Sequence, residues 1–251
     1  MNKTSKILLI YFLSITLSAQ ATESDVLSES DITMLTIDQM PYGYTSSNGE
    51  STGVLYDILN EIINLSDIKS NNVVTPPKRI YSLINSNTKL CMLAADSEIL
   101  RAKLDAVEPI NYFLQAGILP KKGVELSDYS SLKGLTIAIP LGINIGDKFH
   151  NDKSLTKVFP SQYLNAIKML KINRVDAVAG AISTLRFIAK LEGMKEKDLG
   201  NPLIFSQYNV NLFCSNHILK KTRNKLKSAV ITLKNKGRVS EIINKYFTNK
   251  N

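Results

Sequence analysis

The sequence has few residues of the kinds on which hydrolytic enzymes rely. Its only histidines are His150 and His217, and neither belongs to an H-x-x-x-H or H-E-x-x-H pattern. This argues against a zinc hydrolase, which holds its metal through such pairs. The chain contains no G-x-S-x-G elbow, and neither Cys91 nor Cys214 stands in a nucleophile signature. The patterns that mark zinc, serine and cysteine hydrolases are therefore absent.

Long apolar runs are also scarce. The run from Ile7 to Leu17 follows two lysines and leads to the small-x-small triplet Ala19-Gln20-Ala21. It is shorter than the roughly 20 residues that a membrane span needs, and no second run of that length occurs. This pattern is typical of a secretory signal peptide. We expect residues 1–21 to be a signal peptide that is cleaved after Ala21, which places the product in the periplasm.

The overall composition predicts a globular protein with a basic surface. Hydrophobic residues make up 44% of the chain, and the formal net charge is +9. That balance mildly favours anionic ligands or an anionic surface. Many lysines fall between residues 220 and 237, where they read as the solvated face of a helix. Because the basic residues are not interleaved with aromatics and the product is exported, we do not expect nucleic-acid binding.

The two cysteines leave their redox state open. Cys91 and Cys214 each lie in an apolar, strand-like run, "LCMLAA" and "NLFCSN". An exported protein meets an oxidising environment, in which a disulfide is stable. Two buried free thiols are nevertheless the simpler interpretation of these runs, because the sequence does not place the Cα atoms within bonding range.

Strand patterns alternate with helix patterns along most of the chain. The segment "VLYDILNEIINL", residues 54–65, carries apolar residues at helical spacing, and it follows a strand-like segment at 32–40. Such alternation predicts an α/β protein with a largely parallel sheet. The other strands are expected at 71–76, 89–95, 134–140 and 175–181, and the other helices at 78–86, 161–171 and 183–191.

Two apolar stretches are expected to cross between two α/β lobes. They are Phe113 to Leu119 and "IFSQYNVNLFCSN", residues 204–216. The helices predicted at 220–237 and 239–247 would then complete the first lobe. We expect lobe 1 to comprise residues 22–113 and 210–251, and lobe 2 to comprise 114–209.

Five segments in order resemble one protein family. They are "MPYGYTSSNGESTGVLYDILNEI", "DSEILRAKLDAVEPINYF", "LKGLTIAIPLGINIGDKF", "NRVDAVAG" and "GRVSEIINKYF". Together they are similar to the type II periplasmic solute-binding proteins, in the amino-acid-binding (family 3) branch that serves ABC importers. The resemblance spans nearly the whole exported chain. It implies two lobes, a ligand held in the cleft between them, and hinge closure on binding.

The resemblance also implies candidate ligand-binding residues. Arg101 matches the family arginine that grips the ligand's carboxylate, and a guanidinium fits a carboxylate with two parallel hydrogen bonds. The alternative for Arg101 is a surface ion pair with Asp96 or Glu98. Tyr42 and Tyr44 occupy the loop where the family places aromatic walls, or they are ordinary core and surface tyrosines. The remaining candidates are Asp96, Ser97, Arg79 and Asn144.

Three positions depart from the family pattern. Amino-acid binders commonly carry Ser or Thr just before the arginine, where this chain has Ala94 and Asp96, and they carry an aspartate for the ligand's ammonium where it has Ala181. A buried ammonium without a carboxylate partner is costly. Either Asp96 supplies the missing charge, or the ligand is a simple carboxylate or another small polar molecule.

We therefore expect a periplasmic solute-binding protein that captures a small polar, carboxylate-bearing ligand for the permease of an ABC importer. We expect a monomer without a cofactor. Two alternatives are kept: an accessory sensor for a membrane signalling protein, and a dehydratase-like enzyme on the same fold. The enzyme would need a carboxylate such as Asp96, Glu98 or Asp147 as its general acid or base.

Overall fold

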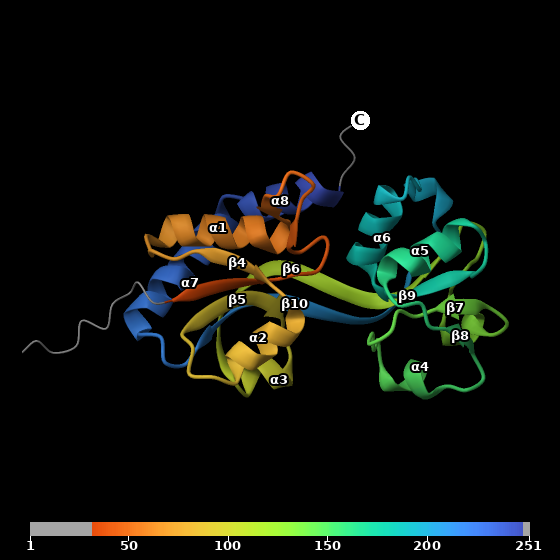
Figure 1. The fold of residues 1–251 in the computed structure, drawn as a ribbon, viewed down its shortest axis with the longest axis horizontal. Helices are drawn as coiled ribbons and strands as arrows, with labels where there is room; N and C mark the ends of the chain where they lie inside the picture. The colour runs from red at the N-terminus through yellow and green to blue at the C-terminus, as the bar shows by residue number, and fades with distance from the viewer. Residues whose placement is uncertain (1–31, 248–251) are drawn as a thin grey trace, which may run out of the picture.

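An eight-stranded mixed sheet runs through the molecule. The computed structural model describes residues 32–247. The strands lie in the order β4-β1-β5-β10-β6-β9-β7-β8, with helices on both faces (Figure 1). A separate hairpin joins β2 (Tyr44–Thr45) to β3 (Ser51–Thr52). The strands of the large sheet are β1 (Thr33–Ile37), β4 (Asn72–Thr75), β5 (Leu90–Ala95), β6 (Leu104–Pro120), β7 (Thr136–Ala138), β8 (Thr156–Val158), β9 (Ala177–Ala181) and β10 (Leu203–Ser215).

The first lobe is built on parallel pairing of β1 with β4 and β5. Its helices from the first half of the chain are α1 (Val54–Ser66), α2 (Pro77–Ile84) and the single turn α3 (Glu98–Arg101). The helical spacing in α1 works as predicted, because Leu55, Ile58 and Ile62 are 2% exposed or less. The chain returns at its end to add α7 (Lys220–Asn235) and α8 (Arg238–Phe247), which pack against α1.

The second lobe repeats the plan with parallel pairing of β7 with β8 and β9. One of its two cores gathers around Ile167, Leu170 and Leu185, and the other around Ile137 and Phe149. Its helices are α4 (Asp147–Asn151), α5 (Tyr163–Lys171) and α6 (Ile182–Leu191), with 3₁₀ turns η2 (Tyr129–Leu132) and η3 (Glu196–Asp198).

The long antiparallel strands β6 and β10 join the lobes (Figure 1). The stretch predicted to cross, Phe113 to Leu119, lies within β6, which begins nine residues earlier, at Leu104. The pairing of the two strands is irregular between Ile204 and Ser206 and between Asn209 and Asn211. In β6, Asn111 adopts a positive φ of 57°. The crossing strands are therefore kinked near the middle, which is where a hinge would bend.

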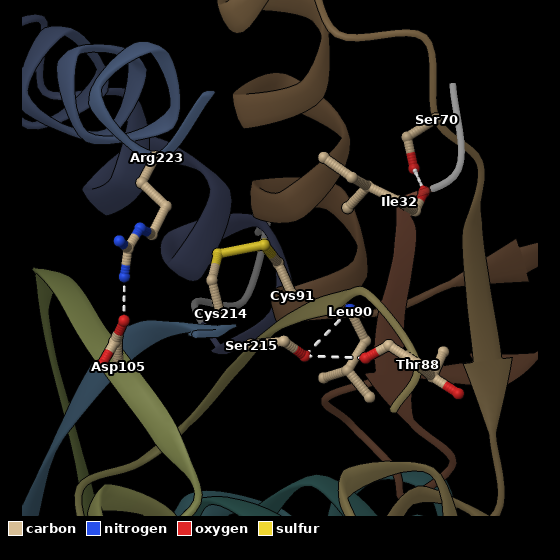
Figure 2. Close-up of a disulfide and its surroundings, with 9 residues drawn as sticks. All are labelled: Ile32, Ser70, Thr88, Leu90, Cys91, Asp105, Cys214, Ser215 and Arg223. Carbon is tan, nitrogen blue, oxygen red and sulfur yellow. Dashed lines mark hydrogen bonds and ion pairs between the residues drawn. A yellow bond between two sulfur atoms is a disulfide. The ribbon is translucent and has the colours of Figure 1, made fainter. Parts of the chain in front are cut away.

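A disulfide links Cys91 in β5 to Cys214 in β10 (Figure 2). The two residues are register partners with Cα atoms 4.1 Å apart. Both are fully buried in the core of the first lobe. Beside the bridge, the Ser215 hydroxyl accepts from the Leu90 N–H and donates to the carbonyl of Thr88 (Figure 2). The structure shows the disulfide and not the free thiols that the sequence favoured, because the pairing of β5 with β10 brings the two cysteines within bonding range.

The observed architecture confirms the predicted α/β fold with two lobes and two crossing strands. The lobe boundaries at 113/114 and 209/210 stay a prediction. The predicted signal peptide, residues 1–21, lies outside the described residues. Within residues 32–247, no helix combines the length and the apolar character that a membrane crossing requires.

Candidate functional site

The turn from β5 to α3 carries the candidates Asp96 and Ser97, and Arg101 ends α3. The Ser97 hydroxyl accepts a hydrogen bond of 3.4 Å from the Leu100 N–H and so caps the helical turn. The Asp96 N–H donates to the Asn209 carbonyl of β10 at 2.8 Å. This turn is thereby tied to a crossing strand, near one of its irregularities.

Arg101 forms a two-point ion pair with Asp96. Its Nε donates to Oδ1 and its Nη2 to Oδ2 of Asp96, both at 2.6 Å. The hydrogen bond and charge of Arg101 lower the pKa of the Asp96 carboxyl. The Arg101 side chain is 54% exposed, and a guanidinium has more donors than this pair uses. The ion-pair alternative for Arg101 is thus realised with Asp96 and not with Glu98, while a grip on a ligand stays a prediction.

Tyr42 and Tyr44 follow β1 and face the second lobe. The Tyr44 ring lies 6.0 Å from the ring of Phe187 in α6, centroid to centroid. Tyr42 is only 4% exposed, and burial raises the pKa of its hydroxyl. The Ser183 and Thr184 hydroxyls of α6 oppose that rise in the Tyr42 pKa, so they lie near it. The loop after β1 therefore contacts α6 across the interlobe boundary.

Tyr246 holds this loop in place from the C-terminal helix. Its hydroxyl donates to Asp57 Oδ2 at 2.7 Å, accepts from the Gly53 N–H at 3.0 Å and lies 2.8 Å from the Thr52 hydroxyl. Gly53 has a φ of 136°, and a Cβ there would stand 2.4 Å from the Tyr42 carbonyl oxygen. Only glycine fits this close approach of the backbone.

Arg79 and Asn144 lie apart from these contacts. Arg79 is exposed on α2 and lines a cavity of about 250 Å³ together with Thr75 and Leu83, inside the first lobe. Asn144 accepts from the Gly146 N–H at 2.8 Å and donates weakly to Asp147, so its amide serves its own loop. Of the candidates, Tyr42 and Tyr44 contact the second lobe, and Asp96 adjoins the crossing strand β10. Arg79 and Asn144 join neither group.

Sequence reasoning missed four residues at the boundary: Tyr112 of β6, Tyr163 of α5, and Ser183 and Thr184 of α6. The Tyr163 hydroxyl accepts from the Ala181 N–H at 3.3 Å. Tyr112 is 8% exposed, and Ser183 lies near its hydroxyl. Tyr112 stands in the "EPINYF" segment that carried the resemblance, so a signal for it existed. No pattern in the sequence marked the other three.

A larger cavity of about 780 Å³ lies between α6, η3 and α8. Arg186 and Lys190 of α6 line it, together with Glu196 and Tyr246. Arg186 forms an ion pair with Glu196, and burial lowers the pKa of its guanidinium. The described part of the chain contains no group of three or more His, Cys, Asp or Glu residues that could hold a metal ion.

Comparisons with known proteins identify solved structures that share this fold. No family model and no curated protein matches the sequence. Among solved structures, the second substrate-binding domain of Lactococcus lactis GlnP, in an open conformation, matches with a TM-score of 0.68 and 15% identity, over 89% of this chain and 98% of that one. A mutant of ArgBP from T. maritima matches with a TM-score of 0.64 and 20% identity, over 87% and 95%.

A third similar structure is a histidine kinase sensor domain described as similar to periplasmic binding proteins. It has a TM-score of 0.65 and 13% identity, over 87% of this chain and 96% of that one. At such identities the likeness concerns the fold. The chain therefore has the type II periplasmic-binding-protein fold that amino-acid-binding domains share, and these neighbours are described as binding or sensor domains.

Proposed function

We propose that this chain is an exported solute-binding protein that captures a small polar, carboxylate-bearing ligand between its lobes and delivers it to the permease of an ABC importer. The observation that carries the proposal is the fold itself: two α/β lobes joined by β6 and β10, with Tyr44 of the first lobe in contact with Phe187 of the second at their boundary. Neighbours with this fold include substrate-binding domains. Export to the periplasm follows from the predicted signal peptide.

Arg101 is the proposed carboxylate-binding residue. The pair with Asp96 holds its guanidinium in one orientation and leaves donors for a second carboxylate. Ser97 and the turn before α3 are proposed to contact the same ligand group. Tyr42 and Tyr44 are proposed as the aromatic wall, and Arg79 and Asn144 as residues that approach the ligand only when the lobes move.

The proposal includes the lobe limits, 22–113 with 210–251 and 114–209, a monomeric state and the absence of catalysis. The kinks of β6 and β10 support hinge motion between the lobes. Binding domains among the structural neighbours support a role without chemistry.

A sensor role is the second candidate, because a histidine kinase sensor domain shares the fold over 87% of this chain. In that case the closed form would dock on a membrane signalling protein in place of a permease. A neighbouring gene for a permease and an ATPase favours import, whereas a neighbouring sensor gene favours signalling.

A thermal-melt screen tests the proposed function. The purified protein is melted with amino acids, simple carboxylates, polyamines and other small polar metabolites. A ligand at about 100 times its dissociation constant is expected to stabilise the fold by about 2.7 kcal/mol. Arg101→Ala should abolish the rise, whereas Arg174→Ala, an exposed arginine of the second lobe, should retain it. A flat response across the panel contradicts the proposal.

A further inference from the structure

Four hydroxyl groups gather where α6 begins, between the lobes. We call Tyr42, Tyr112, Ser183 and Thr184 the hydroxyl cluster. Tyr42 comes from the loop after β1, Tyr112 from the crossing strand β6, and the other two from the first turn of α6. Tyr42 is 4% exposed, Tyr112 8% and Thr184 1%. Residues distant in the sequence thus converge on one buried point.

Three of these hydroxyls lack a hydrogen bond of good geometry. Within residues 32–247, the Tyr42, Tyr112 and Thr184 hydroxyls are buried and none is well paired, although Ser183 and Thr184 lie close enough to Tyr42 to oppose the rise of its pKa. A buried polar group without a partner destabilises the state that contains it, and native proteins normally avoid this unless the group has a further role. Three such groups at one interlobe point indicate that a ligand supplies the missing partners.

The start of α6 adds a positive end to the cluster. Its N-cap is Ala181, which offers no side-chain hydrogen bond to the first turn. The N–H groups of a first turn have no partner inside the helix and carry a partial positive charge. The cluster therefore combines hydroxyl donors with helix N–H donors, an arrangement that suits an oxygen acceptor or an anion.

A cation fits poorly at this point. Among the described residues, no hydrogen bond or ion pair joins a carboxylate to the cluster or to Tyr163, and no carboxylate shifts the pKa of Tyr42, Tyr112 or Tyr163. An ammonium would meet the positive end of α6 and no negative charge, so its desolvation would go uncompensated. The carboxylate nearest to Arg101, Asp96, is already held by that arginine.

We propose that the hydroxyl cluster binds an oxygen-bearing group of the ligand, a hydroxyl or a second carboxylate, and not an ammonium. The ligand is then a hydroxy acid or a dicarboxylate without an α-ammonium group. This inference rests on the proposed function and specifies its substrate class.

Matched pairs of probes test the inference. Calorimetry compares L-glutamate with glutarate and 2-hydroxyglutarate, L-alanine with lactate, and L-phenylalanine with 3-phenyllactate. The members of a pair differ only at the α-ammonium position. We expect the ammonium-free members to bind more tightly. Tighter binding of the amino acids would overturn the inference while leaving the proposed function standing, and no binding by these probes or by the wider screening panel would overturn both.

Variants locate the effect on the cluster. Thr184→Val and Tyr112→Phe each remove one hydroxyl with little change of shape, and each should weaken the preferred probe roughly 3- to 10-fold. Tyr81→Phe, on the exposed face of α2, should leave binding unchanged. Ala181→Asp should shift the preference toward the amino acid of a pair. If the two cluster variants bind like Tyr81→Phe, the ligand does not contact the cluster and the inference is wrong.

Discussion

The Tyr246 hydroxyl ties the end of the chain to the loop that carries Tyr44. It contacts Asp57, Thr52 and the buried N–H of Gly53. Tyr246→Phe would leave that N–H without a partner, so we expect the free energy of unfolding to fall by about 1–3 kcal/mol, as measured by urea denaturation. The exposed Tyr81→Phe is the control, and an equal, small change in both variants would contradict this account.

Asp176 should make the protein sensitive to acid. Its Oδ2 accepts from the Thr136 N–H at 2.9 Å, and its Oδ1 pairs with Lys121 at 2.9 Å. These contacts hold the pKa of the Asp176 carboxyl below its ordinary value of 3.8. At a pH between the folded and the unfolded pKa of Asp176, the unfolded chain binds a proton that the folded protein does not. The contribution of Asp176 to the free energy of unfolding is therefore full above pH 3.8 and is lost as the pH falls through the folded pKa.

Asp176→Asn tests this pH dependence. The amide retains an acceptor for the Thr136 N–H but no longer titrates. We expect the free energy of unfolding to fall less steeply below pH 4 in the variant than in the unchanged protein, with urea titrations at each pH as the measurement. Asp67→Asn, at an exposed position, serves as the control. If the free energy of unfolding of Asp176→Asn falls with pH as steeply as that of the unchanged protein, the role given to Asp176 is contradicted.

Single residues of the site were predictable only where the family pattern marks them. Arg101 and Asp96 were singled out from the sequence, and the structure pairs them. Thr184 could not be predicted, because its importance comes from its position opposite Tyr42, which depends on how two lobes meet. A local pattern contains no information about that orientation, so the hydroxyl cluster becomes visible only in three dimensions.

At the scale of elements, long periodic segments were predictable and short ones were not. The spacing of α1 specified its buried face because thirteen residues repeat the pattern. The four residues of α3 are too few for any periodicity. The start of β6 was missed because charged Asp105 and Glu108 interrupt its apolar alternation. In the fold both carboxylates pair with α7, with Arg223 and Lys234 respectively.

The disulfide joins two elements whose sequence positions lie 123 residues apart. It closes a loop that contains the whole second lobe and therefore restricts the unfolded chain strongly. In the chain-entropy model a loop of this length predicts a large effect, and we expect removal of the bridge to lower the free energy of unfolding by about 2–5 kcal/mol. Urea denaturation of the Cys91→Ala/Cys214→Ala variant measures the loss.

Because both cysteines are fully buried, a reductant must act on the unfolded chain. When the unchanged protein is refolded from urea with and without dithiothreitol, the midpoint urea concentration should be lower with the reductant. The double alanine variant should show one midpoint under both conditions. If reduction leaves the unchanged protein as stable as before, the bridge does not restrict the unfolded chain in the way proposed.

At the scale of the whole molecule, Phe187 connects the two lobes. Its side chain packs against the cores of both, and its ring meets Tyr44 of the first lobe. An aromatic pair of this kind contributes about 0.5–1.5 kcal/mol beyond its buried area. A difference of that size shifts an equilibrium between open and closed lobes several-fold. The contact is therefore expected to favour closure before any ligand arrives.

Phe187→Ala should accordingly open the unliganded molecule. We expect its radius of gyration, measured by small-angle X-ray scattering, to exceed that of the unchanged protein, and ligand affinity to fall because closure then costs more of the binding free energy. Phe159→Ala, an exposed phenylalanine of the same lobe, controls for the loss of a ring. Adding Tyr44→Ala to Phe187→Ala should change the radius little further, since the pair is already broken. A radius that grows again with the second substitution would show that the two rings act separately, and that the lobes are held together by contacts elsewhere along the boundary.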